Sequence, residues 1–241
     1  TIGVAAGSQS YRYPIADPMD AARRFGLTPE DLAAASVAIW TTTPWTLPAS
    51  QAVCLHPLLD YVLAEFERPA GTERLVVAEG LHEAVAKRIG ASETRVAIVR
   101  TDEALLEAGG VGRGGHGRVG GHGRGCVRGR LLRGTAMRIG ASATRVLAKA
   151  SGEKLEGLRL EHPFYERELP VILGDHVTLE TGTGAAHTAP GHGAEDYEMG
   201  RQYGLPIDNP VGPDGRFVAG TPMFEGQGVF DANARIVETL E

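Results

Sequence analysis

Two stretches of the chain hold the residue types that binding and hydrolysis need. Residues 40–50 read WTTTPWTLPAS and gather four threonines, whereas residues 181–197 read TGTGAAHTAPGHGAEDY and place two histidines and two acids among glycines. Hydroxyls can hold a ligand, position water or donate to a developing oxyanion. Glycines allow positive φ and a close approach of the backbone to a ligand. The two stretches therefore predict a polar site, provided that the fold brings them together.

Simpler interpretations of the second stretch stay open at this point. Asp196 stands in the first turn of a predicted helix, where an acid is favourable without any further role. His187 is equally compatible with a hydrogen-bonded strand histidine. His187, His192 and Asp196 could also supply three ligands for zinc, although their spacings of five and four around a flexible turn do not resemble the HExxH motif. The chain has no GxSxG elbow, so a serine nucleophile is not indicated.

The first stretch starts as a strand and then breaks. Residues 37–40 are typical of a buried strand that leads into the threonines Thr41–Thr43. Pro44 lacks a backbone donor and should end strand pairing there. Trp40 and Trp45 should hold the bend in the core by apolar packing. The alternative is a threonine run at a barrel corner, present only for its β propensity.

Apolar patterning and turn residues predict many short strands and a few helices along the chain. The predicted strands are residues 37–40, 52–55, 61–66, 74–78, 169–173 and 176–179. The predicted helices are residues 28–35, residues 79–89, a helix from residue 194 and a last helix from residue 232 to the end. This content indicates a β-barrel or a compact mixed sheet with helices on its rim.

Composition is that of an ordinary globular protein, with 42% hydrophobic and 22% charged residues in 241. The apolar runs are too short to span a bilayer, and no signal-peptide pattern opens the chain. Cys54 and Cys126 lie far apart without CxxC spacing, which predicts a reducing compartment and neither a disulfide framework nor a cysteine-rich zinc site. The net charge of −6 indicates that any contact with RNA is local or is made by another part of a larger protein.

One segment does not fit a folded domain. Residues 109–134 contain twelve glycines and six arginines, a composition that cannot bury enough apolar surface to order a chain and predicts a flexible loop. RIGASETRV (88–96) recurs as RIGASATRV (138–146), offset by fifty residues, with eight of nine positions alike. This indicates one insertion bounded by a direct repeat, in which only one copy can occupy a given strand site. An RNA-binding Arg–Gly segment is the alternative, but aromatic residues for base stacking are lacking.

Taken together, WTTTPWTLPAS and GTGAAHTAPGHGAEDY resemble the editing domain inserted in bacterial isoleucyl-tRNA synthetases, which are class I aminoacyl-tRNA synthetases. LGDHVTLE (173–180) and NPVGPDGRF (209–217) are similar to that family as well. Related valyl and leucyl domains usually carry an arginine after two threonines. Thr43 stands there in this chain, followed by Pro44-Trp45-Thr46, which favours the isoleucyl type.

The resemblance implies an α+β fold with a β-barrel core and peripheral helices, as in the valyl, isoleucyl and leucyl editing domains. It implies one editing domain formed by residues 1–99 and 146–241, interrupted by a flexible Gly/Arg-rich insertion at residues 100–145. It also implies a fragment of a larger, cytoplasmic synthetase. The HIGH-like and KMSKS-like motifs of the parent ATP site are absent, so we expect no aminoacylation by these residues alone.

The function implied is editing, in which the ester of valine mischarged onto the tRNA for isoleucine is hydrolysed after transfer, and valyl-adenylate before transfer is a further substrate to consider. No cofactor and no metal are expected. The expected partners are the acceptor end of the aminoacylated tRNA and the rest of the parent synthetase, with no membrane. Two alternatives remain, a non-catalytic module that binds the acceptor end and a metal-dependent hydrolase.

The resemblance also assigns site residues. The candidates for catalysis are Thr41, Thr42, Thr43, Thr46, His187 and Asp196. The further candidates for substrate contact are Trp45, Ser50, Gly182, Thr183 and Gly184. Asp196 matches the acid that pairs with the substrate α-ammonium, and His187 matches the histidine that limits the size of the side-chain pocket. Ser50 departs from the asparagine that the family commonly has and has a shorter reach.

Overall fold

The computed structural model describes residues 9–68, 71–91, 93–94, 145–180 and 182–240. The strands are β1 (Gln9–Pro14), β2 (Ala35–Thr41), β3 (Ala52–Leu55), β4 (Asp60–Arg68), β5 (Gly71–Ala78), β6 (Glu93–Thr94), β7 (Arg145–Ser151), β8 (Arg159–Glu161), β9 (Glu168–Leu173) and β10 (Ala185–Thr188). The α-helices are α1 (Pro18–Phe25), α2 (His82–Arg88), α3 (Gly152–Leu155), α4 (Ala194–Tyr203) and α5 (Val229–Leu240), and the 3₁₀ helices are η1 (Pro44–Ala49) and η2 (Glu79–Leu81). None of the described helices is both long and apolar enough to cross a membrane.

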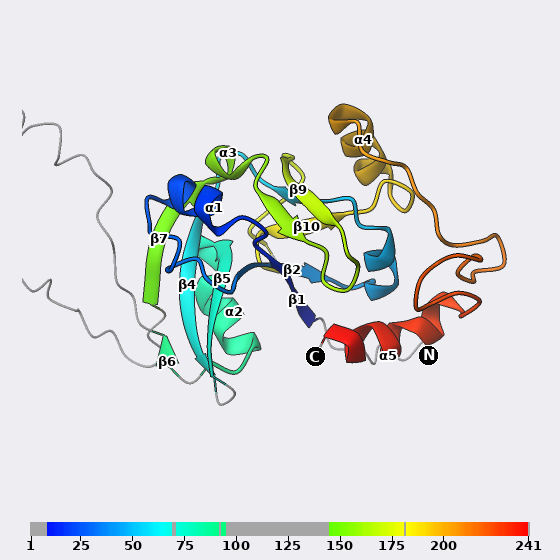
Figure 1. Cartoon of the computed structure of the whole chain (residues 1–241), viewed down its shortest axis with the longest axis horizontal. Helices are drawn as coiled ribbons and strands as arrows, with labels where there is room; N and C mark the ends of the chain where they lie inside the picture. The colour runs from blue at the N-terminus through cyan, green and yellow to red at the C-terminus, as the bar shows by residue number, and fades with distance from the viewer. Residues whose placement is uncertain (1–8, 69–70, 92, 95–144, 181, 241) are drawn as a thin grey trace, which may run out of the picture.

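The strands form two mixed sheets whose inner faces share one hydrophobic core (Figure 1). The larger sheet has the order β1-β2-β5-β4, with β6 and β7 on the outer edge of β4, and the smaller sheet has the order β10-β3-β9-β8. The pairs β2–β5 and β3–β9 are parallel, and the others are antiparallel. Helix α2 covers the outer face of the larger sheet and α4 packs on the outer face of the smaller one. The fold is therefore a mixed α/β arrangement in layers.

Neither sheet closes into a barrel within the described residues, so the predicted β-barrel core is not confirmed. The two sheets approach each other at β1 and β8, where Ile15 and Leu160 form an isolated bridge. Beside it, Ala16 N–H donates to Arg159 O at 3.0 Å. A bridge of this kind joins two sheet edges at one point without making a continuous ladder, so the strands form a two-layer structure and not a closed cylinder.

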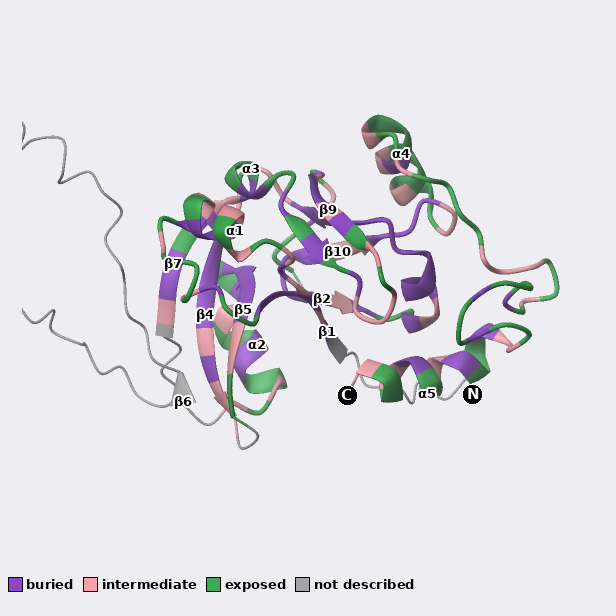
Figure 2. Ribbon diagram, viewed as in Figure 1, coloured by how far each residue is buried: buried purple, intermediate pink, exposed green. Residues whose placement is uncertain are grey.

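The sequence of β4 reflects burial on both faces of the larger sheet. Tyr61 and Leu63 lie in the core between the sheets, while Val62 and Ala64 face α2. All four are fully buried, as the purple part of β4 in Figure 2 shows. A strand that is covered on both sides has no polar face, which explains why Tyr-Val-Leu-Ala is a continuous apolar run.

Most of the predicted elements are confirmed. The predicted strands at 37–40, 52–55, 61–66, 74–78 and 169–173 lie within β2, β3, β4, β5 and β9. The predicted helices at 79–89, from 194 and from 232 correspond to η2 with α2, to α4 and to α5. Gly90 ends the first of these segments with φ +69°, as a glycine after a helix is expected to do.

The predicted helix at residues 28–35 is wrong. The segment is a series of turns in which Leu32 N–H donates to Pro29 O and Ala35 N–H donates to Leu32 O. The left-handed conformation of Ala34, with φ +57°, prevents the turns from continuing as a helix. The turns bury Leu32 completely and lead directly into β2, so packing decides the conformation and the capping pattern at Thr28 does not.

The predicted strand at residues 176–179 is also wrong. Val177 N–H donates to Gly174 O in a turn, and the segment joins no sheet. Val177 is nevertheless buried and packs in one cluster with Cys54 and Ile172. Its apolar character reflects this packing and not strand pairing.

Strand β1 and helix α1 were not predicted. The side chain of Asp17 caps α1 by accepting from Met19 N–H at 2.9 Å and Asp20 N–H at 3.0 Å, and Pro18 follows at the first position. This is the same kind of signal that suggested a helix at Thr28, and at Asp17 the structure does use it.

Strands β6 and β7 lie on β4 as consecutive parts of one strand. Thr94 is paired with Phe66, and Arg145 is paired with Glu65, the next position along β4. Residues 95–144 between them number fifty, which is also the offset of the sequence repeat. Apart from Arg145, the insertion predicted at residues 100–145 lies outside the described residues.

Deletion of residues 95–144 should therefore leave the fold intact. The deletion joins Thr94 directly to Arg145 and keeps the register of both segments on β4, while it removes the entropy cost of a fifty-residue connection between them. We expect the melting temperature, measured by circular dichroism, to be unchanged or higher.

A deletion of residues 95–145 is the matched control for this prediction. It removes one more residue, joins Thr94 to Val146 and slips β7 by one position, which exchanges its buried and exposed faces. We expect its melting temperature to fall by several degrees. Equal melting temperatures for the two deletions would contradict the one-strand interpretation.

Candidate active site

The threonine-rich stretch forms the end of β2 and a 3₁₀ helix. Strand β2 ends at Thr41 and η1 begins at Pro44, so the predicted break at the proline is confirmed. Thr43 N–H donates to Thr41 Oγ1 at 3.1 Å, and the hydroxyl of Thr46 donates to Thr43 O at 2.8 Å. Thr42 and Thr43 are exposed, whereas Thr41 and Thr46 are buried. The turn thus presents two threonines to solvent and fixes the other two.

The histidine of the second stretch lies directly against the first. His187 is on β10, whose antiparallel partner β3 follows η1 along the chain. His187 Nε2 lies 3.2 Å from Thr46 Oγ1, and His187 Nδ1 lies 2.9 Å from Ser50 Oγ. Beside them, Gln51 N–H donates to Thr188 O at 2.8 Å. Two stretches about 140 residues apart in the sequence therefore form one wall.

Asp196 lies on the first turn of α4 and faces the end of β10. Its Oδ2 accepts a hydrogen bond of 2.9 Å from Ala189 N–H. The preceding loop is fixed in a second way, because the rings of Trp45 and His192 meet edge to face with their centroids 5.3 Å apart. Asp196 is close enough to His187 for its charge to affect the imidazole. The structure thus brings together Thr46, Ser50, His187 and Asp196, with Trp45 and His192 alongside.

The GTG segment comes directly before β10 and packs against Trp40 and Ala78. A Cβ on Gly182 would lie 3.2 Å from Trp40 Cβ, and one on Gly184 would lie 2.3 Å from Ala78 Cβ. Both glycines have positive φ, of +87° and +76°. Thr183 is fully buried and its hydroxyl donates to Ala185 O at 3.3 Å. Packing therefore explains these three residues, and their expected contact with substrate stays a prediction.

Burial keeps the site histidines neutral. Burial lowers the pKa of His187 to about 4, although the nearby Asp196 raises it in part and His192 lowers it further. Burial also lowers the pKa of His192, again opposed by Asp196. At neutral pH both imidazoles are therefore uncharged. His187 is poorly suited to take up a proton as a general base, because its pKa lies well below the working pH.

Within the part of the chain that the structure describes, no group of three or more histidine, cysteine, aspartate or glutamate side chains is arranged to hold a metal ion. Both ring nitrogens of His187 already lie within hydrogen-bonding distance of hydroxyls. The three-ligand arrangement of His187, His192 and Asp196 that the spacing left open is therefore not formed.

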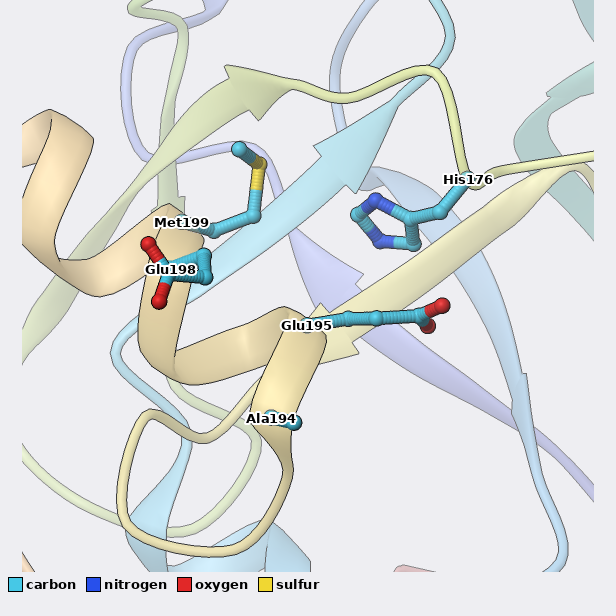
Figure 3. Close-up of a pocket in the computed structure, with 5 residues that line it drawn as sticks. All are labelled: His176, Ala194, Glu195, Glu198 and Met199. Atoms are coloured by element: carbon cyan, nitrogen blue, oxygen red, sulfur yellow. The ribbon is translucent and has the colours of Figure 1, made fainter.

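A hollow of about 330 Å³ lies beside α4 (Figure 3). It is lined by His176, Ala194, Glu195, Glu198 and Met199. The close-up shows Glu195 extending from α4 in the direction of His176, whereas the carboxylate of Glu198 points the other way. None of the predicted site residues lines this hollow, so we do not assign the site to it.

Three residues outside the motifs hold η1 in place, and sequence reasoning missed them. Asn233 of α5 accepts from Trp45 N–H at 3.0 Å. Arg167 donates to Pro48 O at 2.9 Å and to Ser50 O at 2.7 Å. Tyr13 of β1 donates to Ser50 Oγ at 3.0 Å. No local pattern marks these residues, because each acts through a partner that only the tertiary fold supplies.

Comparison with known sequences gives consistent matches. The family described as "Leucyl-tRNA synthetase, editing domain" matches residues 141–234. The isoleucine–tRNA ligase of Thioalkalivibrio sulfidiphilus is 42% identical over 229 residues, which cover 95% of this chain and 19% of that protein. The enzyme of Nitrosococcus oceani is 42% identical over 230 residues, with the same coverage. The chain thus spans about a fifth of the length of these curated relatives.

Comparison with solved structures supports the fold. The editing domain of the cytosolic leucyl-tRNA synthetase of P. knowlesi superimposes with a TM-score of 0.58 at 9% identity, covering 99% of this chain and 96% of that one. The structure described as GlLeuRS-CP1 gives a TM-score of 0.54 at 12% identity, covering 96% and 95%. At such low identity these matches show a shared fold.

The lowered pKa of His187 makes a prediction for stability. The folded pKa of about 4 lies below the usual value of 6.5, so the unfolded chain takes up this proton first as the pH falls. The free energy of unfolding should therefore decrease between about pH 6.5 and pH 4. The buried His162, whose pKa burial lowers to about 3, acts in the same direction. Urea unfolding at several pH values measures this slope.

A His187→Gln variant is the control for this measurement. It should lose the His187 share of the pH dependence and keep that of His162. An identical slope in the variant and the unaltered chain would show that His187 titrates normally in the folded state.

Proposed function

This chain belongs to the family of aminoacyl-tRNA synthetase editing domains, and we propose that it hydrolyses the ester of valine mischarged onto the tRNA for isoleucine. The isoleucine–tRNA ligases among its relatives favour this substrate over the leucine or valine systems. We propose further that residues 1–99 and 146–241 act as one editing domain within a larger synthetase. The acceptor end of the aminoacylated tRNA is then its main partner.

The physical need for such an activity is clear. A pocket that fits isoleucine cannot strongly exclude valine, which is smaller by one methylene. For isoleucyl-tRNA synthetases the established initial preference is only about 150-fold. The remaining errors are corrected by a second site. That site admits valine, excludes isoleucine and hydrolyses the mischarged product.

The observation that carries the proposal is the direct contact of His187 with Thr46 and Ser50, with Asp196 next to it. This contact places three kinds of group together. The His187 ring could face the amino-acid side chain, and hydroxyls and the Asp196 carboxylate lie beside it. Valyl-tRNA offers matching chemistry, since it carries an apolar side chain, an ester and an α-ammonium group.

Asp196 is the group we assign to the α-ammonium. Among the described residues, its carboxylate accepts one protein hydrogen bond, from Ala189 N–H to Oδ2, which fixes its orientation. The other oxygen remains available for a charge-assisted hydrogen bond to the substrate amine. Such a pair would anchor the amino acid with its carbonyl near the threonine peptide.

The exposed Thr42 and Thr43 are then the hydroxyls that meet the ester and the terminal adenosine. Hydroxyls can hold water against the carbonyl or donate to the oxyanion that forms when water attacks. Because hydrolysis of this ester is already downhill, placing the water supplies much of the acceleration. We propose that the free ribose hydroxyl of the substrate assists this step.

Deacylation by the purified chain tests the proposal directly. Valyl-tRNA for isoleucine is incubated with the chain, with and without a chelator, and release of valine is followed. Hydrolysis that the chelator does not affect is the expected result. Binding of the tRNA without hydrolysis would identify an acceptor-end binding module, and loss of hydrolysis with chelator would identify a metal-dependent hydrolase.

Replacement of Asp196 by asparagine should separate its charge from its role in the loop. Asparagine can still accept from Ala189 N–H, but it cannot form an ion pair with the substrate amine. We expect deacylation of valyl-tRNA to slow by about tenfold to a hundredfold with little change in melting temperature. Asp214→Asn, which makes the same charge change at an exposed loop, is the control. Equal rates for the two variants would remove Asp196 from the site.

Replacement of His187 by alanine should enlarge the side-chain pocket. We expect the ratio of valyl-tRNA to isoleucyl-tRNA hydrolysis to fall by at least about tenfold, because the space of the ring admits the extra methylene. His176→Ala, in the hollow that is lined by α4 and by no predicted site residue, is the control and should leave the ratio unchanged. An unaltered ratio in His187→Ala would show that this ring does not limit the size of the substrate.

A further inference from the structure

A continuous chain of hydrogen bonds runs from the core to the threonine peptide through His187. It starts at the hydroxyl of Tyr13, which is fully buried on β1 and donates to Ser50 Oγ at 3.0 Å. It passes from Ser50, also fully buried, to His187 Nδ1 at 2.9 Å. It continues from His187 Nε2 to Thr46 Oγ1 at 3.2 Å and ends at Thr43 O, 2.8 Å further on. Strands β1 and β10 and helix η1 are thus linked through one imidazole.

The number of protons available for this series of hydrogen bonds determines which tautomer the His187 ring adopts. The single hydroxyl proton of Thr46 is donated to Thr43 O, so Thr46 Oγ1 can only accept from His187. His187 therefore carries its proton on Nε2. Its unprotonated Nδ1 then accepts the proton of Ser50, whose oxygen in turn accepts from Tyr13. Every proton in the chain has an acceptor in this arrangement.

The opposite tautomer would break the chain in two places. With the proton on Nδ1, the Ser50 hydroxyl would have to give its own proton to another group, and Nε2 would face an oxygen with no proton to offer. Buried polar groups left without partners cost roughly 1–3 kcal/mol each. The lowered pKa of His187 is consistent with a neutral ring in this environment.

We propose that Tyr13 and Ser50 are positioning residues that hold His187 in the Nε2–H tautomer and fix the orientation of its ring. Since both nitrogens are engaged, the ring carbons are the atoms left to face a substrate. His187 then acts as a rigid wall for an apolar side chain and not as an acid or a base. This inference rests on the proposed editing function for its consequence, but the tautomer itself does not depend on that function.

Because position 50 is a serine in this protein, a hydrogen-bond donor is needed from Tyr13. The short serine side chain reaches one ring nitrogen, and a hydroxyl needs a donor of its own to be fully satisfied when buried. Tyr13 supplies that donor from β1. Arg167 fixes the same residue from outside by donating to Ser50 O at 2.7 Å. An asparagine at position 50 could combine both roles, because its amide donates and its carbonyl accepts.

Nitrogen chemical shifts of His187 test the proposal without reference to activity. The chain is labelled with ¹⁵N-histidine, and the His187 signals are assigned by their loss in His187→Gln. We expect the unaltered chain to show a protonated Nε2 and an unprotonated Nδ1. Ser50→Ala and Tyr13→Phe should shift both signals toward the average of a mixture of tautomers. Signals that stay fixed in both variants would overturn the proposal.

Two further variants show whether the effect is specific. Ser50→Asn should restore shifts like those of the unaltered chain. Tyr61→Phe removes another fully buried phenol hydroxyl, which donates to Gly184 O and is no part of this chain. It should lower the melting temperature without moving the His187 signals. Shifts that move as much in Tyr61→Phe as in Tyr13→Phe would show a general packing effect and overturn the proposal.

Selectivity is the functional readout. If the chain edits, the ratio of valyl-tRNA to isoleucyl-tRNA hydrolysis should fall about fivefold in Ser50→Ala, as loss of one net hydrogen bond suggests, and recover in Ser50→Asn. If valyl-tRNA is not hydrolysed at all, the proposed function fails while the nitrogen shifts still decide the role of Tyr13 and Ser50. If hydrolysis occurs and the shifts do not move, the positioning role fails and the proposed function stands.

Discussion

The hydrogen bonds of His187 to Thr46 and Ser50 are the constraint on which the candidate site depends. They join residues that are 141 and 137 positions apart. The pairing of β10 with β3 makes these hydrogen bonds possible. Two residues separate the end of η1 from the start of β3, so a strand that pairs with β3 lies next to η1. A slip of one residue in this pairing would turn His187 to the opposite face of the sheet. The register of a four-residue strand pair therefore decides whether the site exists.

The rest of the fold stabilises η1, which is weakly stabilised by its own hydrogen bonds. Helix η1 is a single short 3₁₀ segment with a proline inside, so it has few internal hydrogen bonds. Asn233 binds its first turn from α5, and Arg167 binds its last carbonyls. The two layers of strands supply the rigid base beneath it, through a core that both sheets share. The polar groups of the site keep fixed positions because the apolar core shared by the two sheets is densely packed.

The sequence predicts this site better than it predicts the surroundings of the site. The contact between the two motif stretches was expected from the resemblance to a known family and is present in the structure. Five of six predicted strands are confirmed because continuous apolar runs and proline breaks are local signals. The failures are residues 28–35 and 176–179, where Leu32 and Val177 are buried by turns. In both cases tertiary packing overrides a local preference. Tyr13, Arg167 and Asn233 could not be found from sequence, since their partners are backbone or side-chain atoms brought close only by folding.

The polar interior of the site also limits the chemistry that it can perform. Tyr13, Ser50, His187 and Thr46 satisfy one another, and in a region of low dielectric such a closed set is rigid and costly to disturb. A group in that set cannot exchange protons with a substrate without leaving another group unpaired. Reactive capacity therefore belongs to the groups at the rim, namely the exposed Thr42 and Thr43 and the free oxygen of Asp196. Under the proposed editing function, selectivity belongs to this hydrogen-bonded set, and the handling of water and ester belongs to the rim. An aminoacyl ester fits this proposal because it brings its own ammonium group and its own leaving hydroxyl.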